Sequence, residues 1–350
     1  MPEWRFLWQV DESAARRAWL APLALAEVGY AAGARVHRLL YDRGLRARTQ
    51  LDARVVSVGN LAVGGSAKTP LAAFLARELR GRGRRVALLA RGVGGRKSRE
   101  VNVVSDGERM LAGPADVGDE PCLLAASAPG VPVLAGVRRA ALGLRAIAAF
   151  GADVLLLDDG FSHHPLARDL DLVCLDARLG LGNGHVLPRG PLREPVSALR
   201  RAHALVFTRA EPGDPPLPGA ARLPAGLPQF RVGLRKLGLR PVEGGERAPL
   251  ERLGGARVGL LAAIARPDRL ARDLEALGAE VCARRVFADH HGYRPADVAG
   301  LDPELLWVTT AKDAVKIPAG WLEPGRLAVL EEEVDPASAT ALVDFVAARL

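Results

Sequence analysis

The stretch from residue 55 to residue 83 constrains the fold more than any other part of the chain. It contains a hydrophobic run, a Gly-rich turn, Lys68-Thr69-Pro70 and an amphipathic helical pattern, in the order VVSVGNLAVGGSAKTPLAAFLARELRGRG. A strand that passes through such a turn into a helix is the architecture of a phosphate-binding loop. Backbone N–H groups of the turn and of the helix N-terminus would surround phosphate oxygens. We expect Lys68 to neutralise the β- and γ-phosphates and the Thr69 hydroxyl to bind Mg²⁺.

The turn departs from the usual G-x-x-x-x-G-K-[ST] spacing. That pattern places glycines where this chain has Ala62 and Ala67, and Gly64 and Gly65 are offset from it. Because strand, turn, Lys-Thr pair and helix keep the right order, we interpret the turn as a phosphate site, although a purely structural turn is the alternative. The residues expected around the phosphates are Gly64, Gly65, Ser66, Ala67, Lys68 and Thr69.

From residue 54 onward, short β-branched runs alternate with helical patterns, which indicates βαβ units around a parallel sheet. The runs are nearly continuous in apolar residues, as in strands buried on both faces. A Pro- and Gly-rich stretch at 211–228 reads as a connection between domains. The expected strands are 54–58, 85–90, 152–158, 170–176 and 203–208 before this connection, and 257–265, 280–287 and 305–310 after it.

These patterns predict an α/β protein in three parts. The first is an N-terminal helical segment, 1–50, that associates with a membrane. The second is a P-loop NTPase-like parallel sheet flanked by helices, 51–228, and the third is a smaller C-terminal α/β domain, 229–350.

Two acidic residues, Asp158 and Asp159, end the apolar run ADVLLLDDG. In P-loop proteins an acidic residue at the end of a neighbouring strand holds the metal ion, directly or through water. A solvated strand end is the alternative, but the apolar residues before the pair and the glycine after it favour a metal site.

Two further segments carry residues suited to proton transfer. VGDEP contains Asp119 and Glu120, and FADHHGY contains Asp289, His290 and His291. Each has an ordinary interpretation, a helix cap for the first and a surface loop for the second. Phosphoryl transfer to an alcohol needs a group that accepts the hydroxyl proton, and an Asp tuned by a His meets that need. Spacing alone does not pair the two segments.

The N-terminal region holds an apolar stretch, 19–34, that is interrupted by Glu27 and flanked by Arg16, Arg17, Arg35 and Arg38. As a helix it would span about 24 Å, short of the roughly 30 Å hydrocarbon core of a bilayer. An amphipathic segment with aromatic anchors and arginine flanks is typical of a membrane-surface contact. A helix packed on the protein's own core is the alternative.

The net charge, the cysteines and the first residues of the chain indicate which partners and which cellular compartment to expect. The formal charge of +8 favours anionic partners, but no nucleic-acid-binding module is recognisable. The cysteines, Cys122, Cys174 and Cys282, are far apart and form no C-x-x-C pair, so neither a disulfide framework nor a zinc site is indicated. A secretory signal is absent from the start MPEWRFLWQVDESAARR, which is consistent with a reducing cytoplasm.

Taken in order, the motifs resemble the tetraacyldisaccharide 4'-kinase family, lipid A pathway enzymes that phosphorylate a membrane-embedded acylated glucosamine disaccharide. The resemblance extends over nearly the whole chain. Its motifs are VGNLAVGGSAKTP (58–70), ARGVGG (90–95), VGDEP (117–121), DDGFSHH (158–164), DARLGLGNGHVLPRGPLREP (176–195), FADHHGY (287–293) and VTTAKDAVKI (308–317).

The resemblance implies an ATP- and Mg²⁺-dependent kinase that phosphorylates the 4'-hydroxyl of a tetraacylated glucosamine disaccharide 1-phosphate to give lipid IVA. The resemblance also implies that the enzyme acts at the cytoplasmic face of the inner membrane, as a peripheral or monotopic protein. It implies no nucleic-acid partner and no obligate protein partner. The implied catalytic residues are Lys68, Asp119 and His290, and Arg91 joins the nucleotide-binding residues. Arg193 and Glu194 would complete the site, and the implied metal ligands are Thr69, Asp158, Asp159 and Glu194.

Three positions depart from the family pattern. Ala67 replaces the usual glycine before the lysine, Val93 replaces an aromatic residue, and Ser162 replaces a glutamine. The alternative function is a P-loop nucleotide-binding protein without lipid kinase activity. The sequence contains no N-K-x-D signature of guanine specificity.

Overall fold

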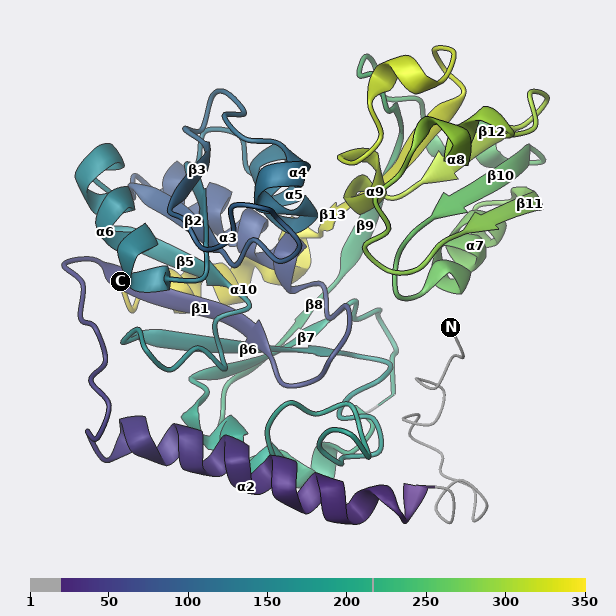
Figure 1. Ribbon diagram of the computed structural model, residues 1–350. Coiled ribbons are helices and arrows are strands. Elements are labelled where there is room, and N and C mark those ends of the chain that lie inside the picture. The colour runs from purple at the N-terminus through teal and green to yellow at the C-terminus, as the bar shows by residue number, and fades with distance from the viewer. Residues whose placement is uncertain (1–19, 216) are drawn as a thin grey trace.

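Two sheets organise the chain in the computed structural model, which describes residues 20–215 and 217–350 (Figure 1). The larger sheet has eight strands in the order β3-β4-β2-β5-β1-β6-β7-β8, and every neighbouring pair is parallel except β3 and β4. Its strands are β1 (Arg54–Asn60), β2 (Val86–Ala90), β3 (Asn102–Ser105), β4 (Val133–Ala135), β5 (Val154–Asp158), β6 (Leu170–Asp176), β7 (Ala204–Thr208) and β8 (Gln229–Val232). All five strands expected before residue 211 are confirmed.

Helices cover both faces of the large sheet, which explains why its central strands are continuous apolar runs. On one face, α3, α5 and α10 share a core with β1, β2 and β5; on the other, α6 packs over residues such as Leu89 and Leu155. The helices of this unit are α3 (Lys68–Gly81), α4 (Pro114–Val117), α5 (Asp119–Ser127), α6 (Arg139–Phe150) and α10 (Pro336–Ala347), with 3-10 turns at Val196–Arg201 and Ala220–Arg222.

The smaller sheet has five strands in the order β11-β10-β12-β13-β9, parallel except for the antiparallel pair β13 and β9. The expected strands at 257–265, 280–287 and 305–310 are confirmed as β10, β11 and β12. The elements are β9 (Leu234–Pro241), β10 (Arg257–Ala262), α7 (Pro267–Ala276), β11 (Glu280–Val286), α8 (Pro295–Ala299), β12 (Leu306–Thr309), α9 (Ala311–Ala314) and β13 (Leu327–Val334), with 3-10 turns at Leu250–Leu253 and Ala319–Trp321.

The two sheets divide the chain at other points than the boundary expected between residues 228 and 229. Strand β8 still belongs to the large sheet, and α10 returns to it after the small sheet is complete. Hydrophobic packing holds this segment on the large unit, because Val334 and Leu342 are part of its core. The chain therefore crosses between the units twice, along the antiparallel strands β9 and β13.

Helix α2 (Leu23–Asp42) lies along the lower edge of the large unit, apart from the helices that cover the sheet (Figure 1). It includes most of the apolar stretch noted in the sequence, whereas Arg16, Arg17 and Trp19 lie outside the described residues. Among the helices in the described part of the chain, none combines the length and apolarity that crossing a bilayer requires.

Candidate active site

The loop between β1 and α3 lies at the carboxyl edge of the large sheet. Gly64 has φ 121° and Ala67 has φ 50°, so both occupy the region of positive φ that favours glycine. Helix α3 begins directly after Ala67, and within the described residues neither a capping side chain nor an acidic residue occupies its first turn. Its first N–H groups and the positive end of its dipole are therefore available to an anion.

Contacts from two other segments hold this loop. The Thr208 hydroxyl at the end of β7 donates a 2.9 Å hydrogen bond to the carbonyl of Ser66, and the Arg209 guanidinium donates one of 2.5 Å to the carbonyl of Gly65. On the other side, the backbone N–H of Arg193 donates to the carbonyl of Leu61 at 2.8 Å. With its carbonyls turned toward these donors, the loop keeps a defined shape.

Lys68, the first residue of α3, is buried at the same edge of the sheet. Burial alone lowers the pKa of Lys68, but the carboxylates of Asp159 and Asp158 outweigh that effect and raise it above its ordinary value. The side chain is therefore a fixed cation beside the loop.

Asp158 ends β5 and is buried next to the start of α3. The Thr69 hydroxyl donates a 3.0 Å hydrogen bond to its Oδ2, whereas its buried Oδ1 has no hydrogen-bond partner within the described residues. Burial raises the pKa of Asp158 to about 7. A buried, unpaired carboxylate oxygen beside a hydroxyl is a site that a hard cation would complete, because Mg²⁺ prefers oxygen ligands.

Two of the expected metal ligands are instead engaged by arginines. Asp159 accepts hydrogen bonds of 2.8 and 2.9 Å from Arg193, and Glu194 accepts bonds of 2.9 and 3.2 Å from Arg201. Glu194 also accepts a 2.8 Å bond from the hydroxyl of Ser162. Across the described ranges, no cluster of three or more His, Cys, Asp or Glu side chains has the arrangement of a metal site.

The expected proton-transfer pair meets across the two units. Asp119 begins α5 in the large unit, and Nδ1 of His290, from the small unit, lies 3.1 Å from its Oδ2 and 3.2 Å from its Oδ1. Burial raises the pKa of Asp119, but the hydrogen bond from His290 and the charge of Lys312 lower it below its ordinary value. The hydrogen bond to Asp119 raises the pKa of His290. Asp119 is thus held as a carboxylate.

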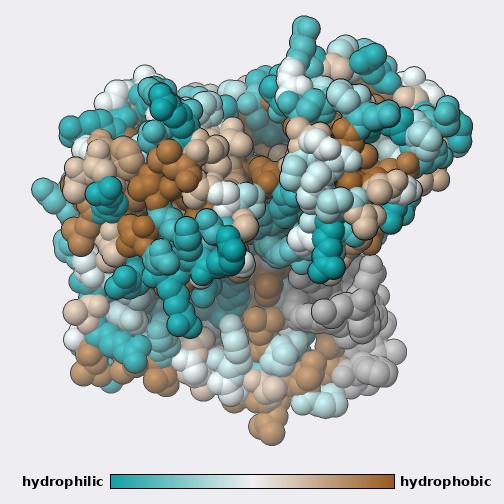
Figure 2. All heavy atoms as spheres, turned by 45° about the horizontal axis from the view of Figure 1, so that its top comes forward, coloured by the Kyte–Doolittle hydropathy of each residue, from teal (hydrophilic) through white to brown (hydrophobic). Residues whose placement is uncertain are grey.

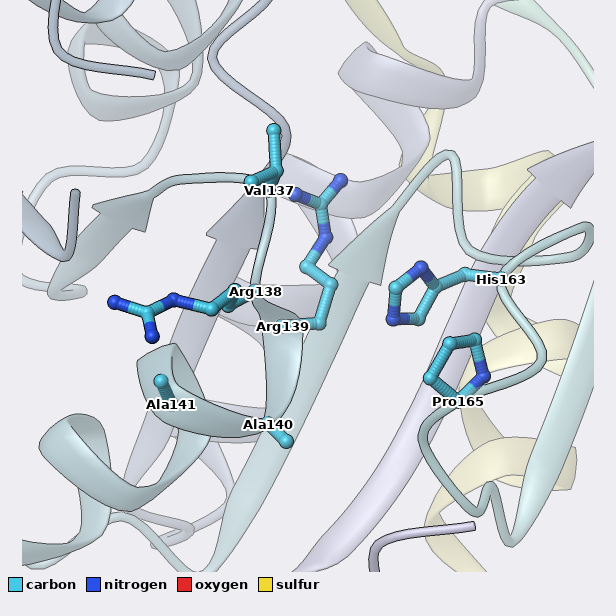
Figure 3. Close-up of a pocket in the computed structure, with 7 residues that line it drawn as sticks. All are labelled: Val137, Arg138, Arg139, Ala140, Ala141, His163 and Pro165. Atoms are coloured by element: carbon cyan, nitrogen blue, oxygen red, sulfur yellow. The ribbon is translucent and has the colours of Figure 1, made fainter. Parts of the chain in front are cut away.

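A pocket of about 340 Å³ opens beside the N-terminus of α6 (Figure 3). The imidazole of His163 and the ring of Pro165, from the segment after β5, face Arg139 and Ala140 of α6 across the pocket. Burial lowers the pKa of His163 to about 4, so its ring is neutral near pH 7. The walls are Val137, Arg138, Arg139, Ala140, Ala141, His163 and Pro165, a mixture of cationic and apolar side chains.

Arg139 links this pocket to the loop site. It is buried, donates 2.6 Å to the carbonyl of Gly136, and places a second guanidinium nitrogen 3.4 Å from the carbonyl of Asp158. Burial lowers its pKa to about 10, so it stays cationic near neutral pH.

Sequence reasoning missed several residues of this site. Lys312 and Lys316 lie 4.0 and 3.9 Å from Asp119 Oδ2, and Arg139 and Arg209 were not singled out. The two lysines belong to the motif VTTAKDAVKI, which carried the resemblance without indicating a role for either one. Of the expected nucleotide-binding residues, Arg91 is exposed at the end of β2.

An open α/β sheet with a Gly-rich loop and a free helix N-terminus at the carboxyl ends of its parallel strands defines a class of protein. Members of this class bind their ligands at that edge, and anionic ligands at the helix N-terminus.

Comparison with known proteins gives the family. The sequence matches the family described as Tetraacyldisaccharide-1-P 4'-kinase over residues 16–350. A tetraacyldisaccharide 4'-kinase of Anaeromyxobacter sp. (strain K) is 47% identical over 321 residues, covering 85% of this chain and 82% of that protein. One from Geobacter sulfurreducens is 40% identical over 351 residues and covers 98% of each. The chain therefore belongs to the tetraacyldisaccharide 4'-kinase family, as its motifs predicted.

A solved structure agrees with this assignment. The crystal structure of LpxK from Aquifex aeolicus in complex with ATP matches with a TM-score of 0.77 at 28% identity, covering 95% of this chain and 99% of that one. The α/β fold with its mixed sheet is thus shared with that kinase.

Proposed function

We infer that this protein transfers the γ-phosphoryl group of ATP to the 4'-hydroxyl of a tetraacylated glucosamine disaccharide 1-phosphate, giving lipid IVA in lipid A biosynthesis. The observation that carries this inference is the family match over residues 16–350, because it spans the site-bearing segments of both units. The geometry of the site is consistent with it, since cations, carboxylates and a free helix N-terminus meet at one edge of the sheet.

The loop between β1 and α3 is the proposed triphosphate site. Its free N–H groups and the cation of Lys68 are suited to phosphate oxygens, and Lys68 would stabilise charge on the transferring group. Arg91 follows β2 at the same edge and is exposed, so it can reach a bound nucleotide. The proposed nucleotide-binding residues are Gly64, Gly65, Ser66, Ala67, Lys68, Thr69 and Arg91.

The residues near the loop also fit Mg²⁺. Thr69 and Asp158 supply a hydroxyl and a carboxylate 3.0 Å apart, and the second oxygen of Asp158 has no hydrogen-bond partner within the described ranges. Mg²⁺ usually takes only one or two carboxylates from a protein, with phosphates and water completing the shell, so a denser cluster is not needed. Asp159 and Glu194 are paired with arginines, but each carboxylate keeps a lone pair that could also bind the ion. When bound, the ion would neutralise charge on the phosphates.

The acceptor hydroxyl needs a group that takes its proton. We assign this role to Asp119, which is ionised at neutral pH and is oriented by His290. The two side chains come from different units and meet in this structure, so the pair depends on the small unit being closed against the large one.

The pocket beside α6 is the proposed site for part of the acceptor. Arg138 and Arg139 supply positive charge, while Val137, Ala140 and Pro165 supply apolar walls. This mixture is suited to a ligand that is both anionic and partly apolar, and Arg139 connects the pocket to the end of β5.

Helix α2 supports association with a membrane surface. One side of the helix is attached to the large unit, because Glu27 accepts bonds from the backbone N–H of Val186 at 3.2 Å and pairs with His185 at 2.9 Å. The opposite side presents Leu25, 83% exposed, and Val36, 57% exposed.

Leu25 and Val36 are about three helical turns apart and lie on one face, as in an interfacial helix. Apolar side chains lie among polar ones along the lower edge of the molecule, where α2 runs (Figure 2). We therefore propose a peripheral or monotopic protein, at the cytoplasmic face of the inner membrane, next to its lipid substrate.

A transfer assay tests the proposed function. Purified protein would be incubated with γ-labelled ATP, Mg²⁺ and the tetraacylated disaccharide 1-phosphate in detergent micelles, and the site of the new phosphate determined by NMR. We expect label at the 4' position. ATP hydrolysis without transfer, or label elsewhere, would reject the proposal.

A further inference from the structure

The ring of His290 lies between partners of opposite hydrogen-bonding character. Its Nδ1 lies 3.1 Å from Oδ2 of Asp119, and its Nε2 lies 3.2 Å from Nζ of Lys312. An ionised carboxylate only accepts hydrogen bonds, and an ammonium group only donates them. A neutral imidazole with its proton on Nδ1 satisfies both neighbours at once.

We propose that Lys312 is a positioning residue of the transfer site, whose ammonium donates to Nε2 of His290 and holds the ring as the neutral Nδ1–H form directed at Asp119. In this arrangement neither ring nitrogen is free to take a proton from the acceptor hydroxyl. That proton passes to a carboxylate oxygen of Asp119 as the hydroxyl oxygen forms its bond to the γ-phosphorus of ATP, while the bond from that phosphorus to the bridging oxygen breaks and ADP leaves. This last step rests on the proposed function, whereas the state of the ring does not.

The fold keeps both partners in place. Lys312 lies in α9, which is anchored by the fully buried Asp313: its Oδ2 accepts bonds from the N–H of Ala263 at 3.1 Å and from the Thr310 hydroxyl at 2.9 Å. His290 has φ 64°, a sparsely populated conformation for a residue with a side chain. Such backbone strain is retained where the surroundings fix the residue.

Other charges around the ring act in both directions. Asp289 lies 3.9 Å from Nε2 of His290 and 3.1 Å from Nζ of Lys312, and with Asp119 it favours the imidazolium form. The Lys312 cation opposes that form. Lys316 lies 3.9 Å from Asp119 and pairs with Asp313 at 3.0 Å. It therefore places a positive charge near the Asp119 carboxylate but does not donate a hydrogen bond to the His290 ring.

This contrast makes Lys316 a matched control. Removing Lys312 takes away the donor to Nε2 and the repulsive charge, so His290 should protonate more readily. We therefore expect the titration midpoint of His290 to rise by about one pH unit or more in Lys312→Met. Lys316→Met should shift it much less, and Lys312→Arg should keep it near the wild-type value.

The measurement is a ¹⁵N–¹H NMR titration of the full-length protein labelled at histidine, with the His290 signals identified by their loss in His290→Gln. Above its midpoint, wild-type His290 should show a protonated Nδ1 and an unprotonated Nε2. A protonated Nε2 in the neutral ring, an unchanged midpoint in Lys312→Met, or an equal shift in Lys316→Met would each overturn the proposal. The readout needs no kinase activity, so it is independent of the proposed function.

Kinetics supply a second readout that a purely structural role would not reproduce. In Lys312→Met, kcat should fall about tenfold near neutral pH, since a placed base contributes about 10²–10⁴-fold, and KM for ATP should change little. The loss should diminish as the pH rises and the ring returns to its neutral form. A pH-independent loss would contradict the assigned role.

Discussion

The hydroxyl of Thr69 donates a 3.0 Å hydrogen bond to Oδ2 of Asp158, a residue 89 positions away in the sequence. The contact joins the start of α3 to the end of β5 and brings the loop, the buried lysine and the carboxylate to one edge of the sheet. The consequences of this arrangement can be measured.

Lys68→Ala should leave the fold intact and reduce turnover severely. The lysine is a buried cation at the proposed triphosphate site, and loss of one group that stabilises transition-state charge costs about 10²–10³-fold in kcat. Steady-state kinetics would give the loss, and circular dichroism would show whether the variant is folded. Near wild-type turnover in a folded variant would show that the loop between β1 and α3 does not bind the triphosphate.

Ala67→Gly should be neutral or favourable. Ala67 has φ 50°, and a left-handed conformation costs about 1–2 kcal/mol in a residue with a Cβ. Glycine avoids this cost, but it destabilises the folded state by roughly 0.5–1 kcal/mol because its unfolded chain has more conformational freedom to lose. We expect a gain of up to about 1 kcal/mol in the free energy of unfolding and unchanged or higher activity. Ala73→Gly in the right-handed interior of α3 is the control and should lose about 1 kcal/mol or more. A clear loss in Ala67→Gly would mean that the alanine methyl group stabilises the loop.

Asp119→Ala and His290→Ala should each lower kcat strongly, and the double variant should lose much less than the product of the two single effects. Non-additivity is expected because the two residues act as one unit, at 3.1 Å from each other. The four proteins would be compared in one assay with saturating ATP. If the loss in the double variant equals the product of the single losses, Asp119 and His290 act independently and not as a pair.

The contact between Asp119 and His290 should also make stability depend on pH. The pKa of His290 is raised, so its contribution is complete below the ordinary histidine value of about 6.5 and is lost as the pH rises through the folded value. The pKa of Asp119 is lowered, so its contribution is present above about 3.9 and is lost as the pH falls through the folded value.

The difference in Tm between the wild type and His290→Gln should therefore be largest between about pH 4 and pH 6.5 and should shrink at higher pH. Thermal unfolding of both proteins across this range is the measurement. His291→Gln, whose imidazole pairs with Asp297 at 2.9 Å within the small unit, is the control for loss of a histidine ion pair. A difference that does not vary with pH would show that protonation of His290 does not strengthen its contact with Asp119.

The exposed face of α2 should bind membranes. Leu25→Asp with Val36→Asp should weaken co-sedimentation with anionic vesicles even at high salt, because the double change removes hydrophobic contacts with the bilayer, which salt does not screen. Arg35→Glu with Arg43→Glu should weaken it mainly at low salt, because the lost term is screened. ATP binding should survive both changes, since neither pair lies in the loop site. Full co-sedimentation of both variants would mean that the membrane contact lies elsewhere.

Much of the site was predictable because it follows strand ends. Lys68, Thr69 and Asp158 were identified from apolar runs that stop at a turn, and parallel strands bring their carboxyl ends to one edge whatever the intervening chain contains. The two sheets were foreseen for the same reason, but five of their strands were not: β3, β4, β8, β9 and β13. β3 and β4 have four and three residues, and their patterns are too brief to distinguish. β9 and β13 have eight residues each, but charged residues interrupt their apolar runs, LRKLGLRP and LAVLEEEV.

The sequence by itself determined the local elements, the loop that joins β1 to α3 and, through its motifs, the family, because these depend on periodicity and on residues close together along the chain. Only the tertiary structure decided that Arg193 and Arg201 pair with Asp159 and Glu194, and that Lys312 reaches the ring of His290. It also decided that β8 and α10 belong to the large unit. Such contacts join side chains that are brought together by the packing of whole elements, and no local pattern encodes that packing.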